Sequence, residues 1–132
     1  MDTPQDIVTD FCKAWERRSL EDVLSFLAPN IVYQNVPSPP MQGIEEAERF
    51  LAPLISNSVK IDFELLSIAV SADGCEVLTE RLDRLHFPGG VVDIPVMGNF
   101  TVRSGKIVEW RDYADSAAIA SQFEKLRSTR TI

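Results

Sequence analysis

Three short segments that favour tight turns divide the second half of the chain into four alternating runs. The segments are SADG at 71–74, PGG at 88–90 and RSGK at 103–106, and each suits a hairpin between neighbouring strands. From Val59 onward the runs alternate apolar and polar side chains, as half-buried strands do. The sequence therefore predicts a four-stranded antiparallel meander.

Helices are predicted where capping residues precede apolar residues at helical spacing. Thr3 before Pro4 is one such signal, and Ser19 with Asp22 resembles a shortened capping box. The residues PSPP at 37–40 cannot continue a strand and should end one. The expected helices cover about 4–17, 20–27, 43–55 and 115–127, and a short strand covers 31–36, which gives the order α-α-β-α-β-β-β-β-α.

Length and charge restrict the class of protein. The 132 residues suffice for one core, so we expect a single domain over 1–132. A formal charge of −7 without a basic stripe makes nucleic acid an unexpected partner. The start MDTPQDIV lacks the features of a signal peptide, and no apolar run is long enough to span a membrane. We therefore expect a cytoplasmic protein without membrane association.

Arg81 and Asp83 interrupt the apolar face of the run 76–87. They alternate with Val77, Thr79 and Leu85, whereas His86 belongs to the opposite face. If the first face points inward, burying either charge alone costs several kcal/mol. The two charges must therefore pair, find further partners or take part in chemistry.

Other strands add polar residues to the same predicted face. Tyr33 and Asn35 share one face of 31–36, and Asp112 shares a face with Val108 and Trp110. The run 91–102 contributes an almost wholly apolar row. A mostly apolar hollow with a few convergent polar groups is typical of a small-molecule site. A buried ion-pair network that only fixes strand register is the structural alternative.

Two carboxylates and one arginine can share a proton and remain neutral overall. Asp83 or Asp112 could then be an acid while the other is a base, provided that burial and the like charge raise one pKa from its ordinary value of ~3.9. Arg81 opposes that rise. The sequence has no Ser-His or Cys-His pair for nucleophilic catalysis, and Cys12 and Cys75 lack metal-ligand spacing. General acid and base catalysis without a metal or cofactor is therefore expected.

Several motifs together resemble the limonene-1,2-epoxide hydrolase family. These are YQNVPSPP at 33–40, Gly43, RLD at 81–83 and GKIVEWRDY at 105–113, in the family's order and at similar spacing over most of the chain. The resemblance implies an α+β fold with a curved mixed, largely antiparallel sheet wrapped by about four helices. This cone-like fold with an internal apolar pocket is shared with nuclear transport factor 2 and ketosteroid isomerase.

The resemblance also implies roles for the polar residues in a one-step hydrolysis of a small apolar epoxide. Asp112 would take a proton from water that Tyr33 and Asn35 hold, Asp83 would protonate the epoxide oxygen, and Arg81 would orient both carboxylates. Ala114, where relatives have larger apolar residues, implies a roomier or differently shaped pocket and a substrate other than limonene oxide. The expected pocket walls are Leu54, Leu85, Ile94, Val96 and Ile119.

Two other functions remain open at this point. An isomerase or cyclase of the same fold would use Asp112 as a base on a ketone or polyketide, and a ligand-binding module would need no acid and base together. A homodimer is expected because relatives dimerise and because the outward sheet face carries apolar side chains. The residues assigned to that outward face are Leu78, Leu82, Met97, Ile107 and Tyr113.

Overall fold

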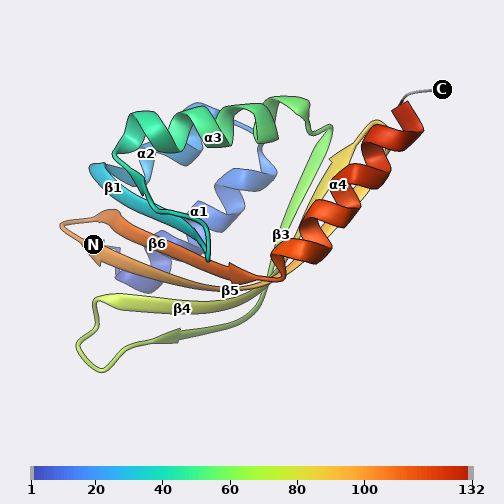
Figure 1. Cartoon of the computed structure of the whole chain (residues 1–132). Helices are drawn as coiled ribbons and strands as arrows, with labels where there is room; N and C mark the ends of the chain where they lie inside the picture. The colour runs from blue at the N-terminus through green and yellow to red at the C-terminus, as the bar shows by residue number, and fades with distance from the viewer. Residues whose placement is uncertain (1, 131–132) are drawn as a thin grey trace.

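One curved sheet of six strands forms the centre of the protein in the computed structural model, which describes residues 2–130 (Figure 1). Strands β3 to β6 pair antiparallel with their neighbours in the chain, so the predicted meander is confirmed. Strand β1 pairs parallel with β6 and antiparallel with β2, which makes the sheet mixed. The order across the sheet is β2-β1-β6-β5-β4-β3. The strands are β1 (Leu27–Val36), β2 (Met41–Gln42), β3 (Lys60–Val70), β4 (Glu76–Phe87), β5 (Gly90–Arg103) and β6 (Lys106–Ala114).

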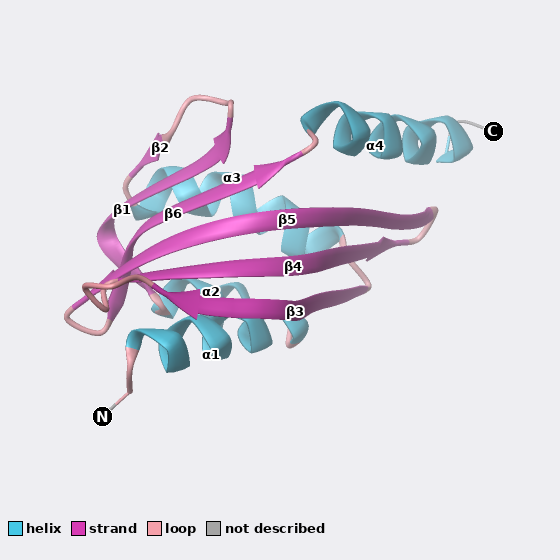
Figure 2. Ribbon diagram, turned by 90° about the horizontal axis from the view of Figure 1, so that it is seen from below, coloured by secondary structure: helices cyan, strands magenta, loops and turns pink. Residues whose placement is uncertain are grey.

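Four helices accompany the sheet and confirm the predicted α+β class. They are α1 (Pro4–Glu16), α2 (Leu20–Ser25), α3 (Ile44–Asn57) and α4 (Ser116–Arg130). The side chain of Thr3 accepts the backbone N–H of Asp6, and Asp6 accepts that of Thr3, so a capping box begins α1. Figures 1 and 2 show α1, α2 and α3 on one side of the sheet, while α4 lies beyond the end of β6.

The first strand is longer than predicted, and the second was missed. Strand β1 begins at Leu27, and the predicted helix over 20–27 already ends at Ser25. Pairing with β6 explains the change, because the N–H of Ile107 donates to the carbonyl of Phe26 at 2.9 Å. Strand β2 has two residues and pairs Met41 with Tyr33. Such a short strand leaves no alternating pattern to detect.

A β-bulge in β6 corrects the prediction for Ile107. Val102 pairs with Ile107, but Thr101 pairs with Glu109, so Val108 is an extra residue in the ladder. The bulge reverses the alternation on one side, and Ile107 is fully buried instead of facing outward. Val108, which the strand pattern assigned to the inner row, is the extra residue of this bulge and is half-buried. Three of the other predicted outward residues are well exposed: Leu78, Met97 and Tyr113.

An aromatic cluster joins α1 to the inner face of the sheet. Phe11 packs edge-on against Trp110 at 5.1 Å and Phe100 at 5.9 Å between ring centroids. Trp15, one turn later on α1, stacks on Phe63 of β3 at 4.6 Å. Residues 11 and 15 meet the sheet together because an i, i+4 pair shares one helix face. Trp15, Phe63 and Trp110 of this cluster also line the cavity described below.

None of the helices within residues 2–130 combines the length and the apolar character needed to cross a membrane.

Candidate active site

A mostly apolar cavity of about 460 Å³ lies on the inner face of the sheet. Its volume falls in the range of about 300–1,000 Å³ typical of small-molecule sites. Tyr33 and Asn35 of β1, Asp83 of β4 and Asp112 of β6 line it. Helices α3 and α4 contribute Phe50 and Phe123. All five residues expected as pocket walls also line it: Leu54, Leu85, Ile94, Val96 and Ile119.

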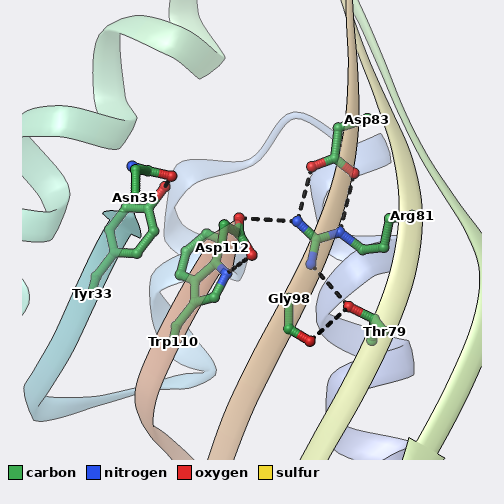
Figure 3. Close-up of polar contacts among 8 residues, drawn as sticks. All are labelled: Tyr33, Asn35, Thr79, Arg81, Asp83, Gly98, Trp110 and Asp112. Atoms are coloured by element: carbon green, nitrogen blue, oxygen red, sulfur yellow. Dashed lines mark hydrogen bonds and ion pairs between the residues drawn. The ribbon is translucent and has the colours of Figure 1, made fainter. Parts of the chain in front are cut away.

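Arg81 lies behind the cavity wall and joins the two carboxylates (Figure 3). Its Nε and Nη2 donate to the two oxygens of Asp83 at 3.1 and 2.9 Å, and Nη2 also donates to Oδ2 of Asp112 at 3.0 Å. Its Nη1 donates to the hydroxyl of Thr79 at 3.1 Å. This bidentate geometry holds the guanidinium rigidly.

The strand register explains how Arg81 reaches Asp112. Thr79, Gly98 and Asp112 form one row across β4, β5 and β6. Because Gly98 has no side chain, the guanidinium of Arg81 can lie over it. A Cβ at position 98 would touch Nη1 of Arg81 and lie 2.6 Å from Oδ1 of Asp112. A glycine inside a strand often marks such a close approach.

The cluster keeps Arg81 charged although its side chain is fully buried. Burial alone would lower the pKa of Arg81, but the carboxylates of Asp112 and Asp83 raise it well above its ordinary value. The rings of Phe63 and Phe100 lie 5.4 and 5.6 Å from the guanidinium carbon and add cation–π contacts. Arg81 is therefore a permanent positive charge between two acids.

Asp83 and Asp112 have different surroundings. Burial raises the pKa of Asp83 to about 6, although the charge and hydrogen bonds of Arg81 lower it. Asp112 receives a second donor, the indole N–H of Trp110, which lies 2.9 Å from its Oδ1. Both side chains are about one-tenth exposed and line the cavity. Asp83 is thus suited to carry a proton near neutral pH.

Tyr33 and Asn35 are aligned with β6 by the parallel pairing. Tyr33 lies beside Trp110 and Asn35 beside Asp112 in the ladder. The hydroxyl of Tyr33 donates to Oδ1 of Asn35 at 3.4 Å. Burial, followed by the charge of Asp112, raises the pKa of Tyr33 above its ordinary value, so its phenol remains a neutral donor. Both side chains can therefore hydrogen-bond a small molecule next to Asp112.

Sequence reasoning missed three residues of this cluster. Strand alternation places Trp110 on the inner face without a polar role and identifies Thr79 and Gly98 only as members of strand faces. In the structure, Trp110 donates to Asp112, and Thr79 accepts a hydrogen bond from Arg81. Gly98 leaves the space in which Arg81, Asp112 and Thr79 come together. The glycine inside an otherwise regular strand was the available signal.

His86 and Cys12 do not belong to the polar cluster at the cavity wall. His86 contacts Asp62 at 2.9 Å, and it does not line the cavity. Burial raises the pKa of the Cys12 thiol to about 12, so this thiol stays protonated at neutral pH. Within the described range 2–130, no group of three or more His, Cys, Asp or Glu side chains is arranged to hold a metal ion.

Comparison with known proteins identifies the family. Residues 3–125 match the limonene-1,2-epoxide hydrolase catalytic domain. Epoxide hydrolase EphG of Mycobacterium tuberculosis is 32% identical over 108 residues, which cover 82% of this chain and 70% of EphG.

Solved structures agree with that match. An LEH-like epoxide hydrolase of M. tuberculosis has a TM-score of 0.76 and 27% identity, covering 92% of this chain and 85% of the other. SalBIII, an epoxide hydrolase/cyclase-like enzyme in pyran ring formation, has a TM-score of 0.78 at 15% identity, covers 87% of this chain and 92% of its own, and shares the fold. Because the family model matches residues 3–125, the chain, whose cavity holds two carboxylates paired with one buried arginine, belongs to the limonene-1,2-epoxide hydrolase family.

Proposed function

We propose that the protein hydrolyses a small apolar epoxide to a vicinal diol in one step. Asp112 takes a proton from a water molecule that Tyr33 and Asn35 hold, and the water oxygen forms a bond to one epoxide carbon. The carbon–oxygen bond of the ring breaks as Asp83 gives its proton to the epoxide oxygen. Arg81 orients both carboxylates. The net change is the addition of one water, without a cofactor.

The shared contact of Asp83 and Asp112 with Arg81 carries this proposal. The arginine pairs with both acids at 2.9 and 3.0 Å, so a proton donor and a proton acceptor lie at one wall of the cavity. The pKa of about 6 for Asp83 leaves part of that residue protonated near neutral pH. Apolar walls suit an epoxide, whose only polar atom would meet the two carboxylates.

A screen of epoxides for diol formation tests the proposal. Purified protein should convert at least one apolar epoxide to its diol, with product measured by gas chromatography. The Asp112→Asn variant is the matched control, because it keeps the shape of the side chain and removes the base. If the parent protein and this variant give equal rates with every epoxide, the proposal is wrong.

Cyclisation is a second candidate because SalBIII shares the fold and is described as epoxide hydrolase/cyclase-like. In that reaction a hydroxyl group of the substrate itself would replace water as the attacking group. The Tyr33 and Asn35 pair beside Asp112 favours a held water and thus hydrolysis. A hydroxy-epoxide offered in the same screen would separate the reactions, since a cyclic ether has the mass of its substrate and a diol has gained one water.

We further propose that the protein is a homodimer that covers the outer face of the sheet. Leu66, Leu78, Met97 and Tyr113 on this face are between 40 and 53% exposed. Large apolar side chains exposed on one face often mark a contact with a partner. Light scattering at micromolar concentration should give the mass of a dimer, and Met97→Lys should shift it toward the monomer. A monomeric mass for the parent protein would contradict the proposal.

A further inference from the structure

The indole N–H of Trp110 donates to the carboxylate oxygen of Asp112 that does not accept the hydrogen bond from Arg81. It donates to Oδ1 at 2.9 Å, while Arg81 donates to Oδ2 at 3.0 Å. Trp110 and Asp112 are two residues apart on β6, so their side chains lie on one face (Figure 3). With a donor on each oxygen, the carboxylate has one defined orientation. Of the two donors, the guanidinium of Arg81 is charged and the indole of Trp110 is neutral.

The ring of Trp110 is itself held on both faces. Tyr33 stacks on it at 4.0 Å with an interplanar angle of 15°, and Phe100 lies at 5.8 Å with an angle of 18°. Phe11 packs edge-on at 5.1 Å. The side chain is 1% exposed, so the indole has no room to turn away from Asp112. One ring thus contacts both the proposed base and a residue proposed to hold water.

We propose that Trp110 is a positioning residue for hydrolysis. Its N–H fixes the ionised carboxylate of Asp112 toward the water, and its ring fixes the phenol of Tyr33 beside that water. This inference rests on the proposed function, because a positioned base matters only if Asp112 accepts a proton. A purely structural role would need the ring but not the N–H. The two roles therefore separate when only the N–H is removed.

The Trp110→Phe variant keeps an aromatic ring and removes the donor. Losing a hydrogen bond to a charged group should lower kcat/KM roughly 10- to 100-fold, mainly through kcat. The acid limb of the kcat/KM profile should also move to higher pH, because a carboxylate without this donor binds a proton more readily. The titratable and charged groups that face Asp112 are Arg81, Asp83, Tyr33 and Cys12.

Those four groups remain in the Trp110→Phe variant. A shift in the acid limb of its kcat/KM profile therefore reports on the protonation of Asp112. Trp15→Phe is the matched control, since Trp15 lines the same cavity but its buried Nε1 has no hydrogen-bond partner among the described residues. Whatever it does to KM, this control should leave the acid limb in place. A Trp110→Phe enzyme with the parent kcat/KM, or with a lower kcat and an unmoved limb, would overturn the proposal.

The hydrogen bond can also be tested in the parent protein without an epoxide. The indole ¹H–¹⁵N resonance of Trp110 should shift strongly between the parent and Asp112→Asn, whereas that of Trp15 should shift much less. This measurement decides the contact even if Trp110→Phe fails to fold. It also distinguishes the two failures, because an inactive parent with the expected shift rejects the hydrolase function, and with it the positioning role, although the hydrogen bond exists. An unchanged Trp110 resonance rejects the positioning role.

Discussion

Asp83 and Asp112 share one nitrogen, Nη2 of Arg81, at 2.9 and 3.0 Å. The two carboxylates come from β4 and β6, with β5 between them. The rigid fork of a guanidinium fixes their separation, since its donors keep constant angles. Removing either carboxylate leaves the other paired with Arg81, whereas removing Arg81 would leave two buried acids unpaired. The carboxylates are therefore the safer positions for substitution.

Asp112→Asn and Asp83→Asn should each lower the rate of diol formation by roughly 10²- to 10⁴-fold while the protein stays folded. Each change keeps the shape of the side chain and removes one proton-transfer group. Steady-state kinetics and circular dichroism would measure the two effects. Asp93→Asn is a suitable control, because Asp93 lies on β5 with its side chain 57% exposed. Either cavity variant with most of the parent rate would remove that residue from the mechanism.

The kcat/KM profile should fall on its alkaline side as the pH rises through about 6. Burial raises the pKa of Asp83 to about 6, and only its protonated form can donate to the epoxide oxygen. Above this pH the donor is lost at up to about tenfold per pH unit. Rates measured from acid to strongly alkaline pH would check this. A profile that stays flat while the protein remains folded would exclude Asp83 as the acid.

Gly98→Ala should reduce kcat strongly and leave most of the fold intact. The new Cβ would lie 2.6 Å from Oδ1 of Asp112 and against Nη1 of Arg81, so the two groups must separate. Gly74→Ala is the control for kcat alone: nothing lies within 4 Å of a Cβ built there, although its φ of +79° should make this variant less stable as well. Kinetics and thermal unfolding of both variants would be compared. Parent-like kcat in Gly98→Ala would mean that the row tolerates a methyl group.

Ala114→Phe should narrow the substrate range toward compact epoxides. Ala114 lines the cavity beside α4, and a phenyl group there would occupy space that a bulky substrate needs. The ratio of kcat/KM for stilbene oxide to that for cyclohexene oxide should fall roughly tenfold or more. Val91→Phe on the exposed face of β5 should leave the ratio unchanged. An unchanged ratio in Ala114→Phe would place the substrate elsewhere in the cavity.

Much of the fold could be predicted because local patterns determine it. Alternation and turn residues located β3 to β6, and capping residues located the first helices. The early start of β1 and the two residues of β2 depend on pairing between distant segments, which no local pattern records. The inward turn of Ile107 depends on the bulge at Val108, a single irregularity in the ladder.

The candidate site was partly predictable for the same reason. Strand phase placed Tyr33, Asn35, Arg81, Asp83 and Asp112 on inner faces, and the structure brings them to one cluster. The contacts of Trp110 and Gly98 depend instead on which residues stand opposite each other across three strands. That register follows from turns, bulges and packing together, so a single strand pattern could not reveal it.

The origin of the new hydroxyl oxygen separates two roles for Asp112. As a base, it activates water, and the oxygen of that water enters the diol directly. As a nucleophile, it would form an ester whose hydrolysis transfers a carboxylate oxygen to the product. An ester would need a second base, and His86 contacts Asp62 and does not line the cavity. Direct attack by water is therefore expected.

A single-turnover experiment in ¹⁸O-labelled water would test this expectation. With enzyme in excess over epoxide, the first diol should carry the label while the carboxylate of Asp112 stays unlabelled, as measured by mass spectrometry of the diol and of the peptide containing Asp112. Asp83→Asn is a useful comparison, because slower protonation should lower the yield without changing the source of the oxygen. An unlabelled first diol, with label later found in Asp112, would establish an ester intermediate and leave the hydrolase function in place.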